Sequence, residues 1–319
     1  MGTFRSLVRQ TALVLRVFVL PALVLPALVL PGTPVHAQTV DDGIMIEAKS
    51  LFTGYLFTYD RWDEYWEGEL LRENQNVGTV TTKTLGWMGT YGVTDRLNVI
   101  AMAPYVWTSP SGGVLKGQSG LQDLTVAAKW NALDVPFTSH GSLRTVAVVS
   151  AGVPLTDYIP DLLPLSIGIN SKHVSTRLTL SFQAKKGIFV NATGSYTWRD
   201  NLTLDRPAYF TDGQQFLTDQ VQLPDVVDYG FSAGYFSPRF HLPFSFTQQI
   251  TRGGGDIRRQ DMPFPSNRMN ASRVGAMALY YLPMNRNLAL RASGSRAVSG
   301  RNVGQSTMFT AGVMYTFKF

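Results

Sequence analysis

The last fourteen residues of the chain, 306–319, alternate between two kinds of side chain. In an extended strand, one face carries Phe309, Val313, Tyr315, Phe317 and Phe319 together with Thr307 and Ala311, and the other face is mostly small or polar. Side chains two residues apart share a face of a strand. The pattern is typical of a membrane strand that meets lipid on one side and a polar lumen on the other. The alternative is an edge strand of a soluble sandwich.

Segments of strand character recur through the chain with lengths of roughly ten to fourteen residues, enough for a tilted membrane strand. The alternation is clearest in the fourth, sixth, seventh and ninth of them and weak in the second and tenth. We predict twelve strands, at about 47–59, 80–93, 96–107, 120–133, 142–153, 173–185, 187–199, 226–237, 239–251, 271–282, 287–298 and 306–319.

The connections between these segments alternate in length. Short turns follow the second, sixth, eighth and tenth strands, and the turn after the fourth, 134–141, is somewhat longer. Long segments follow the first, third, fifth, seventh and ninth strands. Outer-membrane barrels have short periplasmic turns and long extracellular loops. The sequence therefore predicts an all-β protein in the bacterial outer membrane, a transmembrane antiparallel β-barrel of about twelve strands with both termini on the periplasmic side.

The first 37 residues have the pattern of a secretory signal peptide. Arg5, Arg9 and Arg16 precede an apolar run at 17–30, and Val35-His36-Ala37 places small residues at the positions that signal peptidase requires. The alternative, a transmembrane anchor, is disfavoured because the run is shorter than the roughly 20 residues a spanning helix needs. We predict cleavage after Ala37, which leaves residues 38–319 as the barrel domain.

Composition narrows the possible functions. Three of the 28 basic residues and none of the 22 acidic residues lie in 1–37, so the remainder has a net charge of +3, and nothing indicates nucleic-acid binding. The chain has no cysteine, which excludes disulfides and thiolate metal sites. Beyond the leader, the histidines His140, His173 and His241 lie in separate regions. We therefore predict no metal site and no cofactor.

Polar and charged side chains share one face of the clearest strands, which we expect to line the lumen. An arginine on the lipid face near mid-bilayer costs about 2–4 kcal/mol, so charges belong inside. Asp123 and Lys129 fall on the same face of one strand, either as a structural pair or as a pore constriction. The lumen-lining candidates are Asp123, Lys129, His173, Arg177, Asn191, Arg199, His241 and Arg291.

The long segment after the fifth strand, 154–169, is apolar in an unusual way for an external loop. Three prolines, at 154, 160 and 164, prevent it from pairing as a central strand. It either folds into the barrel mouth, as a plug or a landing site for apolar solutes, or packs against neighbouring loops. The apolar mouth-loop candidates are Leu155, Ile159, Leu162, Leu163 and Leu165.

Two motifs resemble a known family. Residues 91–99 read Tyr-Gly-Val-Thr-Asp-Arg-Leu-Asn-Val and are followed by Pro104-Tyr105, and residues 120–124 read Gly-Leu-Gln-Asp-Leu and lead to Lys129. Their order resembles the family of outer-membrane transporter barrels named for the MetA pathway of phenol degradation, although Gln122 replaces a glycine usual in the second motif. The resemblance implies an outer-membrane barrel and the passage of small apolar or aromatic compounds, and it supplies no binding residues.

A pattern of the type His-x-Ser, at His173 and Ser175, raises the alternative of a lipid hydrolase. A two-residue step puts a base and a nucleophile on the same face of a strand. That face is here the polar one, whereas a lipid hydrolase needs its nucleophile toward the membrane. Thr176-Arg177 also replaces the Asn-Gly that follows the serine in the phospholipase family. We therefore predict no catalytic residues and no enzyme activity.

These observations predict a channel or transporter for passive or facilitated uptake of small hydrophobic or aromatic compounds. The alternative is a structural or adhesin-like surface barrel. Expected partners are outer-membrane lipids and lipopolysaccharide, the barrel-assembly machinery through the C-terminal Phe319, and small apolar solutes. We expect lipopolysaccharide to bind either through a divalent cation at the acidic stretch 60–73 or directly at the basic loop 252–268. The alternative is that both segments are solvated loops.

Overall fold

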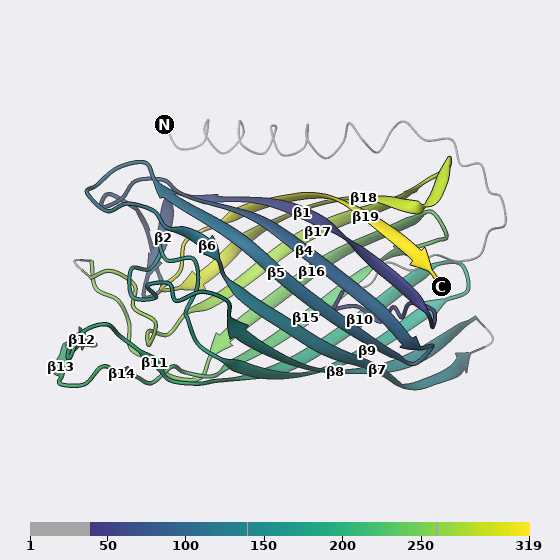
Figure 1. Ribbon diagram of the computed structural model, residues 1–319, viewed down its shortest axis with the longest axis horizontal. Coiled ribbons are helices and arrows are strands. Elements are labelled where there is room, and N and C mark those ends of the chain that lie inside the picture. The colour runs from purple at the N-terminus through teal and green to yellow at the C-terminus, as the bar shows by residue number, and fades with distance from the viewer. Residues whose placement is uncertain (1–38, 139, 260) are drawn as a thin grey trace. The chain divides into compact units, whose positions relative to one another are not determined.

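The computed structural model describes residues 39–138, 140–259 and 261–319 (Figure 1). The signal peptide expected at residues 1–37 lies outside this part of the chain. None of the described residues belongs to a helix long and apolar enough to span a membrane. The described residues form nineteen strands together with turns and loops.

Twelve long strands in the described part of the chain pair antiparallel, each with its neighbour in sequence, and β19 pairs with β1 from Ser50↔Lys318 to Arg61↔Thr307. This pairing closes the sheet, and it confirms the predicted barrel. The strands are β1 (Ser50–Trp62), β4 (Val80–Thr94), β5 (Leu97–Pro110), β7 (Asp123–Thr138), β8 (Gly141–Pro154), β9 (His173–Ala184), β10 (Ile188–Arg199), β15 (Val226–Phe236), β16 (Phe240–Thr251), β17 (Asn270–Leu282), β18 (Asn285–Arg301) and β19 (Thr307–Lys318).

One wall strand is interrupted. β6 (Ser119–Leu121) pairs with the outer part of β5, and β7 pairs with the first part of β5, from Leu97 to Met102. Gln122 separates the two strands, and its backbone N–H bonds to the Pro104 carbonyl at 3.0 Å. β6 and β7 therefore act as one wall strand with a break at Gln122.

Alternation along the strands produces a wall with two different faces. On β9, Leu178 and Leu180 are half exposed on the outside, whereas Thr179 between them is fully buried inside. On β16, Phe244 is 70% exposed and His241 is 3% exposed. Apolar side chains face outward and polar ones face inward, as a membrane barrel requires.

The two ends of the barrel differ. Connections of two or three residues join β4–β5, β7–β8, β9–β10, β15–β16 and β17–β18 at one end. The loops at the other end carry short strands, most of which Figure 1 labels at the left. These are β2 (Glu64–Glu67), β3 (Leu70–Glu73), β11 (Leu202–Thr203), β12 (Tyr209–Thr211), β13 (Gln214–Phe216) and β14 (Gln220–Val221). The short-turn end is periplasmic by the rule for outer-membrane barrels.

The turn between β7 and β8 is shorter than predicted. The sequence suggested a turn at 134–141, but pairing continues to Thr138↔Gly141 through irregularities that begin after Asn131 and Pro136. A bulge adds a residue to one strand without ending the ladder. β7 therefore continues past Pro136, although a proline usually marks the end of a strand.

The lipid-facing surface leads to a prediction. Replacing Leu178 by Arg places a charge on the outer face of β9 and should lower the free energy of unfolding by about 2–4 kcal/mol near mid-bilayer. The measurement is urea unfolding in lipid vesicles. The matched control is Leu217→Arg, at a loop leucine that is 87% exposed, which should change stability little. Equal effects of the two substitutions would mean that Leu178 does not face lipid.

Candidate functional site

The chain just before β1 lies inside the barrel at its periplasmic end. We call residues 39–49 the N-terminal segment. Ile46, 3% exposed, packs with inward-facing side chains of β1, β4, β17, β18 and β19, and Met45, 8% exposed, packs with those of β5, β7 and β8. These neighbouring side chains reach different parts of the wall, so the segment crosses the lumen. Burying two such side chains stabilises this position by about 1.5–3 kcal/mol each.

Hydrogen bonds fix the backbone of the N-terminal segment against the wall. Asn98 on β5 is fully buried; its Oδ1 accepts from the Ile46 N–H at 3.1 Å, and its Nδ2 donates to the Ile46 carbonyl at 3.2 Å. The Ala48 N–H donates to Asp95 Oδ1 at 3.0 Å. At Gly92 a Cβ atom would lie 2.0 Å from the Glu47 carbonyl oxygen, so only glycine allows the segment to pass so closely.

Charged side chains also hold the segment. Lys129 on β7 is fully buried, and its Nζ lies 2.8 Å from Asp42 Oδ1 and 2.6 Å from the Thr39 carbonyl oxygen. Arg177 on β9 forms an ion pair with Asp41. An unpaired buried ammonium would be very costly, so Asp42 is required where Lys129 is buried. The two acids therefore join the segment to the β7 and β9 side of the wall.

A cavity of about 400 Å³ lies between the N-terminal segment and strands β9, β10, β15, β16, β17 and β18. Its lining combines cationic, anionic and apolar side chains. Arg177, Arg273 and Arg291 contribute positive charge, Asp228 contributes a carboxylate, and Asp41 and Asp42 border it from the segment. The volume is within the range of small-molecule sites.

Three polar atoms that are buried beside this cavity have no hydrogen-bond partner among the described residues: Arg291 Nε, His241 Nδ1 and Asn191 Oδ1. The His241 ring packs between Phe189 and Phe236, with centroid distances of 5.2 and 5.6 Å. A buried polar group without a partner costs about 1–3 kcal/mol. The cavity therefore offers polar groups that a water or a ligand can satisfy.

The inside of the barrel has an apolar side and a polar side. On the inward faces of β1, β4 and β5, which we call the apolar wall, the two middle rows are apolar. The register aligns Leu56, Gly86 and Pro104 in one row and Gly54, Met88 and Met102 in the next, and polar residues such as Thr58, Thr84 and Thr90 lie beyond them. We call the inward faces of β9, β10, β15 and β16 the polar wall, where one row reads Thr179, Thr193, Gly230, Thr247. The lumen is therefore amphipathic.

The loop 155–172 folds over the mouth at the other end. Leu165, fully buried, packs with Val77 and Val80, and Ile167 packs with Val106 and Tyr158. Val80 and Val106 belong to the inward faces of β4 and β5. The loop therefore packs against the inward faces of β4 and β5 at the mouth of the barrel.

Polar contacts hold the same loop. Tyr158 donates its hydroxyl to Asp123 Oδ1 at 2.7 Å and accepts from the Asn170 N–H at 2.8 Å. Thr108 donates its hydroxyl to the Leu165 carbonyl at 2.5 Å. Burial and the neighbouring Asp123 raise the pKa of Tyr158, so its phenol stays protonated and remains a donor.

The apolar candidates of this loop differ in their surroundings. Leu165 is buried and Leu163 is half-buried, whereas Leu155, Ile159 and Leu162 are exposed. Leu163 borders a hollow of about 180 Å³ among the extracellular loops, together with Trp62, Tyr65 and Met262. Part of the loop thus packs on the wall while another part borders an apolar hollow at the mouth.

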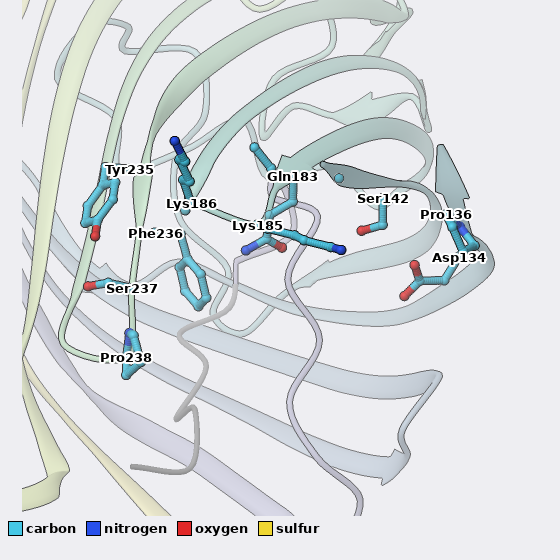
Figure 2. Close-up of a pocket in the computed structure, with 13 residues that line it drawn as sticks. Asp134, Pro136, Ser142, Gln183, Lys185, Lys186, Tyr235, Phe236, Ser237 and Pro238 are labelled. Atoms are coloured by element: carbon cyan, nitrogen blue, oxygen red, sulfur yellow. The ribbon is translucent and has the colours of Figure 1, made fainter. Parts of the chain in front are cut away.

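A larger hollow of about 770 Å³ lies along the periplasmic rim, where β7, β8, β9, β10 and β15 meet their turns. Figure 2 shows Lys185 between the side of the hollow that carries Phe236 and the side that carries Asp134 and Pro136. It is formed by turn residues and strand ends rather than by the polar and apolar walls. It is therefore distinct from the cavity inside the barrel.

The predicted relation between Asp123 and Lys129 needs a correction. They share a strand face, but Asp123 binds Tyr158 of the mouth loop and Lys129 binds Asp42 of the N-terminal segment. Six residues of strand separate them by about 20 Å. They therefore do not pair with each other. Asp123 holds the loop at the mouth, and Lys129 holds the N-terminal segment at the periplasmic end.

The remaining candidates lie as follows. His173 lies across from Gly152 on β8, where a Cβ would come within 2.1 Å of its ring, and in register with Arg199 on β10. Arg199 lies near the carboxylates of Asp225 and Asp228. Ser175 pairs with Ser150, on the same inward face as His173. Within the described residues, no hydrogen bond joins Ser175 to His173.

The acidic stretch and the basic loop are tied to other side chains. Arg72 Nε lies 2.5 Å from Glu67 Oε2, and Arg301 binds Glu69 at 2.9 Å. Arg259 donates to Gln75 Oε1 at 3.3 Å. The described residues contain no group of three or more His, Cys, Asp and Glu side chains arranged to hold a metal ion.

Sequence reasoning missed Asp41, Asp42 and Asn98, and therefore the N-terminal segment. One signal was available: the lumen-lining candidates included the cations Lys129, Arg177, Arg199 and Arg291 but only one carboxylate, Asp123. Charges inside a barrel need counter-charges. The two acids that precede the first strand were the available source.

Comparison with known proteins agrees with this fold. The COG4313 outer membrane channel from Pseudomonas putida F1 is similar with a TM-score of 0.67 and 16% identity, over 88% of this chain and 100% of that chain. The translocator domain of the autotransporter NalP from Neisseria meningitidis gives 0.43, with 12% identity over 85% and 89%, and the NanC porin gives 0.42, with 9% identity over 82% and 98%. A search of curated proteins found no match.

The match at the level of sequence is to a protein family. A family model described as "Putative MetA-pathway of phenol degradation" matches residues 71–312, which extend from β3 into β19. This agrees with the resemblance of the two motifs at 91–105 and 120–129. The chain therefore belongs to this phenol-degradation family and is a twelve-stranded barrel of the bacterial outer membrane.

Proposed function

We propose that the protein is an outer-membrane channel through which small molecules with an apolar or aromatic part enter the cell. The observation that carries the proposal is the amphipathic lumen, with a cavity of about 400 Å³ on its polar side. A solute with an apolar body can pass along Leu56, Met88 and Met102 while its polar part stays at the polar wall. Membership of the phenol-degradation family supports a solute of this kind.

Both ends of this route are obstructed. The N-terminal segment crosses the periplasmic end, and the loop 155–172 covers part of the mouth. A barrel of twelve strands lies between barrels filled by side chains and wide porins. Passage therefore requires the N-terminal segment to move, and we propose that it is the gate.

We propose no enzymatic role. His173 and Ser175 face the lumen rather than lipid, and among the described residues no hydrogen bond joins the two; His173 Nδ1 instead lies 3.5 Å from the Ser171 carbonyl oxygen. A purely structural role would leave the cavity and its unpartnered polar atoms without use. We also propose that residues 1–37 are removed on export and that Phe319, 76% exposed beside the periplasmic end, is read by the assembly machinery.

The test is swelling of liposomes that contain the purified protein, across matched solutes of increasing polarity. The proposal expects faster swelling with a small aromatic alcohol than with a sugar of similar size. Protein-free liposomes supply the background rate. A rate equal to that background for every solute would reject a channel and leave the structural alternative.

The mouth loop leads to a second prediction. Leu165→Ser removes a fully buried leucine that packs with Val77 and Val80, so the loop should leave the wall and single-channel conductance should rise severalfold. The matched control is Ile159→Ser, in the same loop at a side chain that is 55% exposed, which should leave conductance unchanged. Assembly is checked by heat-modified migration on a gel. Equal conductance in both variants would mean that the loop does not cover the route.

A further inference from the structure

The strands around the lumen cavity carry more positive than negative charge. Arg177, Arg273 and Arg291 line the cavity, and Asp228 is the carboxylate that the strands contribute to its lining within the described residues. Asp60 of β1 also lies near Arg273. The other two carboxylates at the cavity, Asp41 and Asp42, belong to the N-terminal segment. The positive charge of the strands around the cavity is therefore balanced in part by the N-terminal segment, which is not itself a strand of the barrel.

The two acids differ in how they are held. Asp42 is nearly buried and binds the buried ammonium of Lys129. The Asp41 side chain is 67% exposed, whereas that of its partner Arg177 is 20% exposed. An ion pair with one exposed partner is weak, because water competes for the charge. The guanidinium of Arg177 is therefore available to another carboxylate at little cost.

Two other side chains at the cavity each have one buried nitrogen without a hydrogen-bond partner among the described residues, although both lie near Asp42. Arg291 Nε is a buried donor, and His241, 3% exposed, has a buried Nδ1, and neither atom meets a hydrogen-bond partner among the described residues. Arginine recognises carboxylates through paired N–H donors, and a histidine ring nitrogen can add a third bond. Both side chains line the cavity with Arg177. Together they form a site that suits an anion.

The same cavity has apolar lining. Phe189 and Met277 contribute to it, and the Phe189 ring packs against His241 at a centroid distance of 5.2 Å. A volume of about 400 Å³ accommodates one aromatic ring with a carboxylate. The site therefore combines an apolar surface with cationic donors.

We propose that this cavity binds small amphipathic carboxylates, with Asp41 and Asp42 taking the place of the solute carboxylate in the closed channel. A solute anion at Arg177, Arg291 and His241 competes with Asp41 and weakens the hold on the N-terminal segment. The solute thus favours the opening of its own route. This inference rests on the proposed channel function and adds its substrate class and the means of opening.

The experiment compares benzoate with its neutral analogue benzamide on the full-length mature protein. Binding is measured by calorimetry in detergent, and entry by liposome swelling. Benzoate should bind at least tenfold more tightly than benzamide. Arg291→Gln should weaken benzoate binding at least tenfold and leave benzamide binding unchanged. Asp41→Asn, which leaves the Asp42–Lys129 pair intact, should tighten benzoate binding at least threefold, because the carboxylate that competes for Arg177 is gone.

The matched control is Arg296→Gln, on the same strand as Arg291 but bonded to Gln305 at 2.8 Å near the loops. It should leave both affinities unchanged. Heat-modified migration on a gel shows whether each variant is assembled.

Equal affinity for benzoate and benzamide would overturn the carboxylate site. Unchanged benzoate affinity on removal of the Asp41 carboxylate would overturn the competition. Failure of the channel itself looks different, because then neither solute would enter liposomes faster than the background. Entry of benzamide without preference for benzoate would leave the channel standing and reject this inference.

Discussion

Every backbone N–H and C=O group of the wall needs a partner within the protein, because lipid offers none. The pairing of β19 with β1 along twelve residue pairs satisfies this demand and removes the open edge. A closed ring then fixes the two faces of each strand. Leu178 must face lipid if Thr179 faces the lumen. The alternation of each strand therefore determines both the side chains that face lipid and the side chains that face the lumen.

The lumen then has its own electrostatic constraint. Lys129 is fully buried, and its charge is compatible with burial only because Asp42 and the Thr39 carbonyl lie within hydrogen-bond distance. Both partners belong to the N-terminal segment, as do Met45 and Ile46 in two separate apolar clusters. The contacts that neutralise Lys129 and bury Met45 and Ile46 therefore also hold the segment across the periplasmic end. A solute with a carboxylate and an apolar part can make the same two kinds of contact with the wall, an ion pair and apolar packing.

The sequence predicted the strands well because the two-residue period and the uneven loop lengths are local signals. The alternation was weak in the second and tenth predicted strands; in the tenth, β17, Leu279 and Tyr281 lie inside while apolar Ala278 and Tyr280 lie on the other face, so alternation could not separate them. The sequence could not predict the partner of Lys129, because Asp42 is 87 residues away and outside any strand. Nor could it predict that Leu165 packs on Val80 while Ile159 stays exposed, since that depends on the path of the loop across the mouth.

The central claim is that solutes pass through the lumen only when the N-terminal segment leaves it. The chain has no cysteine, so Asp41→Cys and Arg177→Cys, at the two ends of an ion pair, can be joined alone by a short thiol-reactive cross-linker that contains a reducible disulfide. The most direct measurement is the entry of a small aromatic solute into liposomes with this variant, cross-linked and then reduced, with the cross-link verified by mass spectrometry. The account predicts no entry in the cross-linked form and recovery on reduction. Equal entry in both forms would contradict it.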